Sequence, residues 1–348
     1  MQFIKPGINI DFTGRRFKAY TLSFALTIMT IISLLIHGGP NYGIDFSGGL
    51  LIQVKFTQNV PIEKIRSGLN QMGMKNPSVQ NFGEIANSEF LIRTSGSEIG
   101  GESLSQTVTK SLQESTGAIP EIRRIEMVGA QVGQDLRTKA LLAIFYSLLF
   151  ISIYISGRFE MKWIVSGIIA GALMSVVYLL AIFNTGIPLL ITIALIVTLL
   201  LFGYMKLKYA MGAVVSLIHD VVITIGILSI LDIEISLQII AALLTLIGYS
   251  LNDTIVVFDR IRENLIHANK LSMEKIINKS INDTLSRTVL TGSTTLFPLF
   301  ALFFLGGEII HDFAFTMIVG IIVGTYSSFF IASPILLLSE KTEIKKSK

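Results

Sequence analysis

Eight long apolar runs dominate this sequence and restrict the folds open to it. They lie at residues 19–36, 140–157, 163–183, 187–205, 209–230, 235–258, 288–306 and 313–338. Each run is close to the ~20 residues that a helix needs to cross a bilayer. Because 51% of the 348 residues are hydrophobic, the sequence predicts a polytopic α-helical membrane protein. Runs of this length exclude a soluble nucleic-acid-binding protein, although the net charge is +4.

The basic residues between the runs predict how the chain crosses the membrane. The short loops at 183–188, 231–236 and 306–312 contain no Lys or Arg, whereas segments 259–287 and 339–348 carry several. Because cytoplasmic loops are enriched in Lys and Arg, we expect both termini, and these two segments, in the cytoplasm.

Residues 38–137 have a different pattern from the rest of the chain and are expected outside the cytoplasm. Apolar residues alternate as in strands at 50–56, 78–82, 89–93 and 121–128, and they recur at helical spacing at 61–74 and 103–115. The order strand–helix–strand–strand–helix–strand suggests a ferredoxin-like α+β domain. Gly48 and Gly49 fit a tight turn into its first strand.

The remaining boundaries follow from these runs. We expect the cytoplasmic N-terminus and the first spanning helix at 1–37 and a second spanning helix at 138–158. A pair of spans follows at 159–208, then a final set of spans at 209–338 and a cytoplasmic tail at 339–348. Within the cytoplasmic segment 259–287, residues 273–285 predict an amphipathic helix on the membrane surface, with a solvated connector as the alternative.

Asp253 is the strongest candidate for a functional group. It lies in the apolar run 235–258, flanked by Asn252 and Thr254. A carboxylate inside a spanning helix costs about 2.5–3.5 kcal/mol on insertion scales and is a functional-site hypothesis by default, often a proton or ion relay. The alternative is a hydrogen-bonded structural Asp between packed helices.

Three further charged residues lie in or beside the runs, and each has a structural alternative. Asp220, beside His219, lies near the middle of its run, Arg287 begins another, and Asp312 begins the last. Carboxylates that neutralise a guanidinium could convert proton binding at Asp253 into helix movement. Alternatively, Asp220 is a packed hydrogen-bonded residue, Arg287 an interfacial anchor and Asp312 a helix N-cap.

Other patterns narrow the chemistry further. The chain has no cysteine, which excludes disulfides, thiolate metal sites and iron–sulfur clusters. It has no GxxxxGK[ST], HExxH or GxSxG motif, so we expect a protein that is not an enzyme and holds no cofactor or metal. The pairs Gly320/Gly324 and Gly167/Gly171 have GxxxG spacing, which is typical of helix–helix contacts.

Several motifs in order resemble the SecD/SecF family of protein-export membrane proteins, specifically its SecF branch. They cover nearly the whole chain and lie at 43–49, 154–160, 217–221, 248–264, 286–288, 306–308 with 311–314, and 324–328. The resemblance implies a relative of the RND superfamily, with proton-relay roles for Asp253, Arg287 and Asp312. It also implies six membrane helices, so the pair within 159–208 is an apparent insertion.

The same resemblance implies the function and the partners. The chain would act with SecD in a bacterial cytoplasmic membrane and use the proton-motive force to promote late-stage export of unfolded preproteins. SecYEG, SecA and YidC-like components would be neighbours, and no nucleic acid would be bound. Two alternatives remain open: an RND-type half-transporter for lipids or small molecules, and a scaffold without transport activity that holds the translocon together.

Overall fold

The computed structural model describes residues 9–74, 77–82, 88–94, 102–182, 186–267 and 271–339. Its contacts divide the chain into two compact units. The helical unit consists of Met1–Asn41, Ala140–Glu234 and Gln238–Lys348, and the sheet unit consists of Tyr42–Lys139 and Ile235–Leu237.

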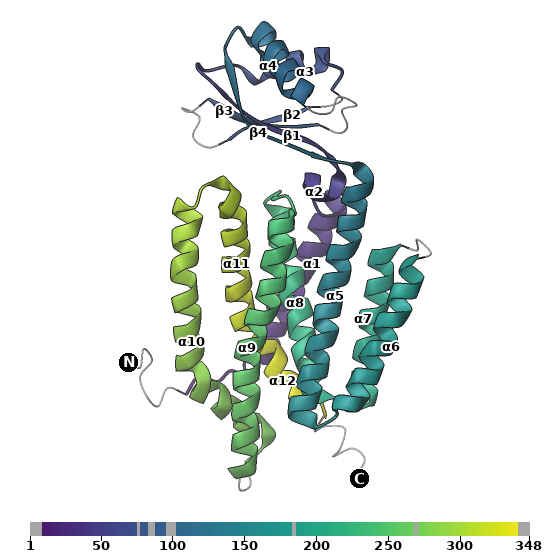
Figure 1. Ribbon diagram of the computed structural model, residues 1–348. Helices are drawn as coiled ribbons and strands as arrows, with labels where there is room; N and C mark the ends of the chain where they lie inside the picture. The colour runs from purple at the N-terminus through teal and green to yellow at the C-terminus, as the bar shows by residue number, and fades with distance from the viewer. Residues whose placement is uncertain are drawn as a thin grey trace. The chain divides into compact units, whose positions relative to one another are not determined.

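Long helices form the helical unit (Figure 1). They are α1 (Arg16–Ile36), α5 (Ala130–Glu160), α6 (Trp163–Ile182), α7 (Ile187–Tyr204), α8 (Lys208–Ile230), α9 (Leu237–His267), α10 (Met273–Leu305) and α11 (Glu308–Ser327). Among the described residues, eight helices are long and apolar enough to cross a membrane. The chain is therefore a polytopic helical protein, as the apolar runs predict.

The centre of the helical unit is α8, whose apolar side chains are mostly buried. Leu217, Val257 and Phe329 are among the residues of one continuous apolar core between α8, α9 and the end of α11. A π-helical turn, Ser328–Ala332, follows α11 directly. It is followed by α12 (Ser333–Ile335) and a 3₁₀ turn, Leu336–Ser339. Single π-turns of this kind are frequent at functional sites.

The hairpin α6–α7 lies at one edge of the bundle (Figure 1). A smaller apolar cluster that includes Phe145, Leu149 and Ala170 packs it against α5. Within the described part of this chain, Gly167 and Gly171 form no helix–helix contact face, because a Cβ at either position would meet no atom within 4 Å.

The structure also corrects the prediction for residues 273–285. They do not form a separate helix on the membrane surface, because α10 continues without interruption from Met273 to Leu305. The sequence from 285 to 288 contains no Gly or Pro, so nothing in it ends the helix at the point where the amphipathic pattern becomes apolar. Arg287 therefore belongs to the same continuous helix as the polar residues before it.

The N-terminal segment crosses the polar half of α10. Asn282 uses its side-chain amide to accept a hydrogen bond from the Ile10 N–H and to donate one to the Ile10 carbonyl, each 2.8 Å long. Asn278 accepts a 2.8 Å hydrogen bond from the Phe12 N–H. Arg16 forms an ion pair with Glu274. We call residues 9–16 the N-terminal strap.

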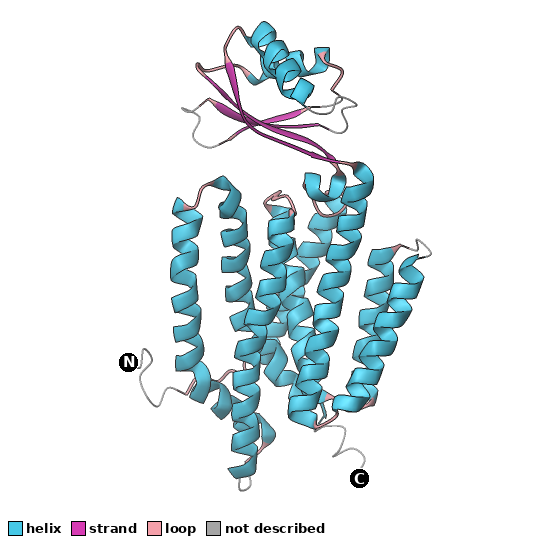
Figure 2. Cartoon of the chain, viewed as in Figure 1, coloured by secondary structure: helices cyan, strands magenta, loops and turns pink. Residues whose placement is uncertain are grey.

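The sheet unit has four strands and two long helices (Figure 2). The elements are α2 (Ile44–Ser47), β1 (Gly49–Phe56), α3 (Ile62–Gln71), β2 (Ser78–Asn81), β3 (Glu89–Thr94), α4 (Glu102–Thr116) and β4 (Pro120–Val128). The strand order is β2-β3-β1-β4, and every pair is antiparallel.

Alternating burial in β1 explains how this sheet forms its core. Leu50, Ile52, Val54 and Phe56 are buried on one face, where they pack with buried residues of α3 and α4. Because side chains alternate across a strand, this pattern places the intervening residues on the opposite face. The predicted strand and helix segments of 38–137 correspond to these observed elements.

Candidate functional site

Asp253 is buried in α9, and only 3% of its surface is exposed. Its Oδ2 atom has no hydrogen-bond partner among the described residues. Arg287 of α10 is the positive charge that acts on this carboxylate. A buried carboxylate oxygen without a partner is costly, so this group needs either a proton or the field of Arg287 to remain there.

A cavity of about 650 Å³ adjoins the helix turn that carries Asp253, although the Asp253 side chain is not among the residues that line it. It is lined by residues of α5, α9 and α10, namely Tyr154, Arg158, Asn252, Ile255, Val256, Asp259, Arg260, Glu263, Asp283, Thr284 and Arg287. Asn252, the neighbour of Asp253, and Arg287 are both exposed. A cavity lined by polar and charged side chains therefore lies next to the turn of α9 that contains Asp253.

Ion pairs join the helices around this cavity. Arg158 of α5 lies 2.7 Å from Asp259 of α9, and Arg260 of α9 lies 2.9 Å from Asp283 of α10. These contacts join α5 and α10 to the polar end of α9. Their partly exposed side chains can exchange partners at little cost, because surface ion pairs contribute only about 0–1 kcal/mol.

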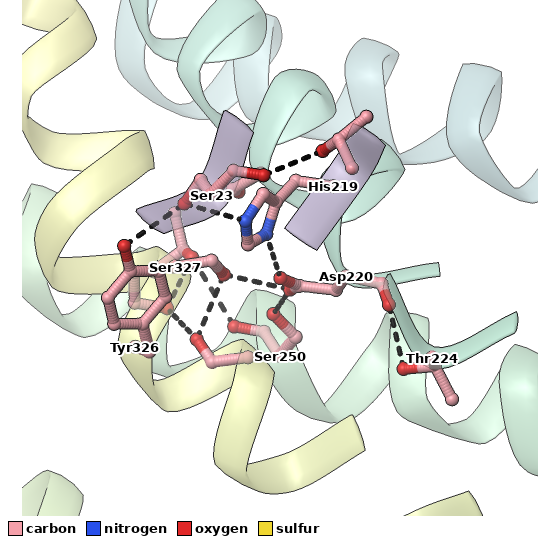
Figure 3. Close-up of polar contacts among 12 residues, drawn as sticks. Ser23, His219, Asp220, Thr224, Ser250, Tyr326 and Ser327 are labelled. Atoms are coloured by element: carbon pink, nitrogen blue, oxygen red, sulfur yellow. Dashed lines mark hydrogen bonds and ion pairs between the residues drawn. The ribbon is translucent and has the colours of Figure 1, made fainter. Parts of the chain in front are cut away.

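Asp220 is the second buried carboxylate, and its hydrogen bonds are numerous (Figure 3). Ser250 of α9 and Ser327 of α11 donate hydrogen bonds of 2.6 and 2.8 Å to Oδ2. His219 Nδ1 lies 3.0 Å from Oδ1. The carboxylate, which has no exposed surface, thus connects α8 to both neighbouring helices.

His219 extends this network to α1 (Figure 3). Its Nε2 atom lies 3.0 Å from the Ser23 hydroxyl, which lies 3.0 Å from the Tyr326 hydroxyl. Tyr326 in turn donates a 2.7 Å hydrogen bond to the Ala19 carbonyl. A continuous chain of polar groups therefore runs from Asp220 to the backbone of α1.

One turn of α9 links Asp220 and Asp253. Ser250, which holds Asp220, stands three residues before Asp253, so both lie on adjacent turns of one helical face. One residue further, Thr254 Oγ1 lies 2.8 Å from the Ser328 hydroxyl in the π-helical turn. The consecutive residues Ser327 and Ser328 thus bind Asp220 of α8 and Thr254 of α9, respectively.

Gly320 and Gly324 allow this close approach of α11 to α9. A Cβ at Gly320 would lie 2.6 Å from Leu246 Cδ1, and a Cβ at Gly324 would lie 2.9 Å from both Cβ and Oγ of Ser250. Only glycine leaves room for these contacts, in agreement with the GxxxG spacing.

Asp312 does not join either carboxylate in the described contacts. It lies 3.1 Å from its neighbour His311, and 46% of its side chain is exposed. It is not a helix cap either, because α11 begins at Glu308 and its N-cap position is Gly307. Among the described residues, no group of three or more His, Cys, Asp or Glu side chains could hold a metal ion.

Reasoning from the sequence did not identify the serine partners of Asp220 and His219. Ser250 and Ser327 donate to Asp220 and Ser23 contacts His219, and the three serines lie in different helices with no shared sequence spacing. The only available signal was the polar run at 325–328, which is unusual inside an apolar span.

Together, these features define a polytopic membrane protein with buried carboxylates at the contacts of several spanning helices. A family profile for the protein-export membrane protein SecD/SecF, C-terminal region, matches residues 107–205 and 180–342, and a profile for the SecD/SecF GG motif matches residues 33–60. The chain belongs to the SecD/SecF family of protein-export membrane proteins. The two matched segments of the first profile overlap at 180–205, within the predicted insertion.

Individual relatives point to the SecF branch of this family. Protein translocase subunit SecF of Calditerrivibrio nitroreducens is 40% identical over 342 residues, which cover 97% of this chain and 96% of the relative. The protein of the same name from Vibrio alginolyticus is 41% identical and covers 97% of this chain and 91% of its own length.

A solved structure agrees in fold. The crystal structure of SecDF from Thermus thermophilus, described as a translocon-associated membrane protein, superposes with a TM-score of 0.68 at 29% identity. The match covers 96% of this chain but only 39% of that chain.

Proposed function

We propose that the chain acts as the SecF-type subunit of a protein translocase and works together with a SecD subunit. The near-complete match to proteins named protein translocase subunit SecF supports this function. The match to 39% of a SecDF chain supports the pairing, because the remainder of that chain is available to supply the SecD part. The channel SecYEG, the SecA and YidC-like components and an unfolded preprotein complete the proposed setting.

We further propose that Asp253 binds and releases the proton that drives this work. The single observation that carries the proposal is the Oδ2 atom of Asp253, which has no hydrogen-bond partner among the described residues, in a residue that is 3% exposed and is acted on by the charge of Arg287. A protonated Asp253 is neutral and needs no counter-charge, whereas an ionised Asp253 attracts Arg287. Each protonation step therefore changes the force between α9 and α10.

The cavity that adjoins the helix turn of Asp253 supports a route for the proton. Arg287 and Asn252 both line it, together with the charged ends of α9 and α10. The basic residues at 259–287 favour a cytoplasmic location for this end, so the proton would leave toward the cytoplasm. Arg287 itself remains charged, because a guanidinium does not release its proton in the physiological range.

The saturated hydrogen bonds of Asp220 favour a different role for this residue. Ser250, Ser327 and His219 occupy its carboxylate oxygens. We assign Asp220 the role of an anchor that holds α8, α9 and α11 together while α10 moves. Asp312 is excluded from this central group by its position at the half-exposed start of α11.

The proposed architecture follows from the same reasoning. All eight apolar helices cross a bacterial cytoplasmic membrane, with both termini in the cytoplasm. The sheet unit is a ferredoxin-like extracytoplasmic domain, because its order β2-β3-β1-β4 with antiparallel pairs is that of a split βαβ arrangement. The hairpin α6–α7 adds two crossings and preserves the orientation of α8 to α11.

The test replaces Asp253 with Asn in membrane vesicles that carry the partner subunits. The substitution keeps the side-chain size and removes the titratable group. We expect assembly to be unchanged and the proton-gradient stimulation of preprotein translocation to fall at least tenfold. The matched control is Asp312→Asn, which should keep stimulation within twofold; full stimulation in Asp253→Asn would refute the proposed proton site.

A further inference from the structure

The loop before β1 makes contacts that a simple turn does not need. Asp45 Oδ2 accepts a 2.9 Å hydrogen bond from the backbone N–H of Leu237, 192 positions away in the sequence. The Gly43 N–H donates a 2.9 Å hydrogen bond to the Ile235 carbonyl. Tyr42 and Ile235 also form a parallel β-bridge. The loop therefore binds the segment that leads into α9.

The other side of the loop is in contact with the first turns of α5. A Cβ at Gly48 would lie 2.6 Å from the Ala130 Cα, and a Cβ at Gly133 would lie 2.9 Å from the Gly48 backbone nitrogen. Gly48 also has a positive φ of +70°, a conformation that favours glycine. Close backbone packing therefore fixes the loop against α5, and the loop cannot follow α9 freely.

Asp45 caps the beginning of α9. Leu237 is the first residue of this helix, and the first N–H groups of a helix have no acceptor within the helix. A carboxylate at this end satisfies one of them and interacts favourably with the helix dipole. By their contacts, Ile235–Leu237 belong to the sheet unit, whereas the helix from Gln238 onward belongs to the helical unit.

We propose that Asp45 is a positioning residue that fastens the start of the Asp253 helix to the sheet unit, so that movement of α9 is transmitted to this unit. This inference rests on the proposed proton coupling at Asp253. The distance along the helix from Leu237 to Asp253 is about 24 Å at 1.5 Å per residue. Because hydrogen bonds along the helix make it stiff, a shift at Asp253 reaches Leu237 with little loss.

Hydrogen–deuterium exchange tests the contact without reference to activity. The chain is purified with its SecD partner, and exchange is followed in a peptide that contains Leu237. We expect Asp45→Ala to raise exchange in the first turn of α9 at least tenfold, because the N–H loses its acceptor. Asp45→Asn should stay within threefold, since an Asn side chain is also a good cap. Asp135→Ala, which changes an exposed carboxylate of the same unit, is the matched control.

Gradient-stimulated translocation tests the transmission. We expect Asp45→Ala to reduce stimulation at least fivefold and Asp45→Asn to keep it within twofold. An equal loss in both variants would contradict the capping role and point to a need for the charge. Raised exchange in Asp45→Ala with full stimulation would show that the contact is local and would overturn transmission.

A second variant removes the donor instead of the acceptor. Leu237→Pro deletes the N–H, and proline is well tolerated at the first position of a helix. This variant should lose as much stimulation as Asp45→Ala, and the double variant should lose no more than either single change. Additive losses would refute the single shared contact, even where Asp45→Ala assembles poorly.

A further measurement distinguishes failure of the Asp45 contact from failure of the proposed proton site at Asp253. Asp253→Asn is measured in the same vesicles. Full stimulation in that variant removes the proton site and, with it, transmission through α9. The exchange result would still establish the contact between Asp45 and Leu237.

Discussion

Asp220 and Asp253 are equally buried carboxylates in adjacent helices, yet their surroundings differ. Asp220 is 0% exposed, and its oxygens have hydroxyl and imidazole partners from three side chains. Asp253 is 3% exposed, and its Oδ2 has no partner among the described residues. Burial alone therefore does not identify a site that changes its protonation state, whereas the number of partners separates an anchor from a candidate relay.

Removing the carboxylate of Asp220 or of Asp253 tests the difference between them most directly. Asp220→Ala should destabilise the helical unit by about 2–5 kcal/mol, because it leaves three buried polar groups without their acceptor. Asp253→Ala should change stability little, since it removes a buried oxygen that has no partner. Unfolding of the purified protein in mixed detergent micelles measures both, and equal destabilisation would contradict the distinction.

The close approach of α11 to the Asp220 region gives the next largest effect. Gly324→Ala would place a Cβ 2.9 Å from Ser250, and overpacking of this kind costs about 1–3 kcal/mol. Gly248→Ala on α9 is the matched control, because its Cβ would meet nothing within 4 Å. It should stabilise the helix by up to about 1 kcal/mol. A neutral Gly324→Ala in the same unfolding assay would mean that α11 can move away without loss.

Removing one hydroxyl partner of Asp220 should have a smaller effect. Ser327→Ala leaves the carboxylate with Ser250 and His219, and a helix–helix hydrogen bond in a membrane contributes about 0.6 kcal/mol on average, up to about 1.7. The double variant Ser250→Ala/Ser327→Ala should lose more than the sum of both changes, because it removes both hydroxyl partners of Oδ2. Simple additivity in a double-mutant cycle would indicate independent contacts.

The ion pair between Arg158 and Asp259 should matter least for stability. Their side chains are 40% and 37% exposed, so water screens the pair and its contribution is about 0–1 kcal/mol. Asp259→Asn should therefore shift unfolding by less than this amount, in contrast to Asp220→Ala. High salt should abolish the small difference, and a shift that persists at 1 M salt would show that the pair is less accessible than its exposure indicates.

The sequence was sufficient where a local pattern determines the structure. Apolar runs predict the long helices, and alternation predicts β1. A carboxylate in an apolar run singles out Asp253, which the structure buries, whereas its role as a proton site stays a prediction. The sequence was insufficient where partners come from distant segments. The acceptors and donors around Asp220 lie on separate helices, and the partner of Asp45 lies 192 residues away. Contacts between segments so far apart in the sequence leave no periodic pattern in it.

The continuity of α10 shows another limit of pattern reasoning. A change from amphipathic to fully apolar residues near Leu285 resembles a boundary between two helices. The backbone of α10 nevertheless passes through it, because hydrophobicity reports the solvent around a segment and does not report where its helix ends. The sequence singled out Arg287 as a candidate, which stays a prediction, but it did not predict that one continuous helix joins Arg287 to the polar residues before it.

This connection has a consequence for the N-terminal strap. Asn278 and Asn282 bind the backbone of Phe12 and Ile10, and the Phe12 ring packs 5.5 Å from those of Phe329 and Phe330. A displacement of α10 by more than a hydrogen-bond length must either break these amide contacts or pull α1 with it. The N-terminal strap thus couples α1 to the polar end of α10, so we expect these two helices to move together.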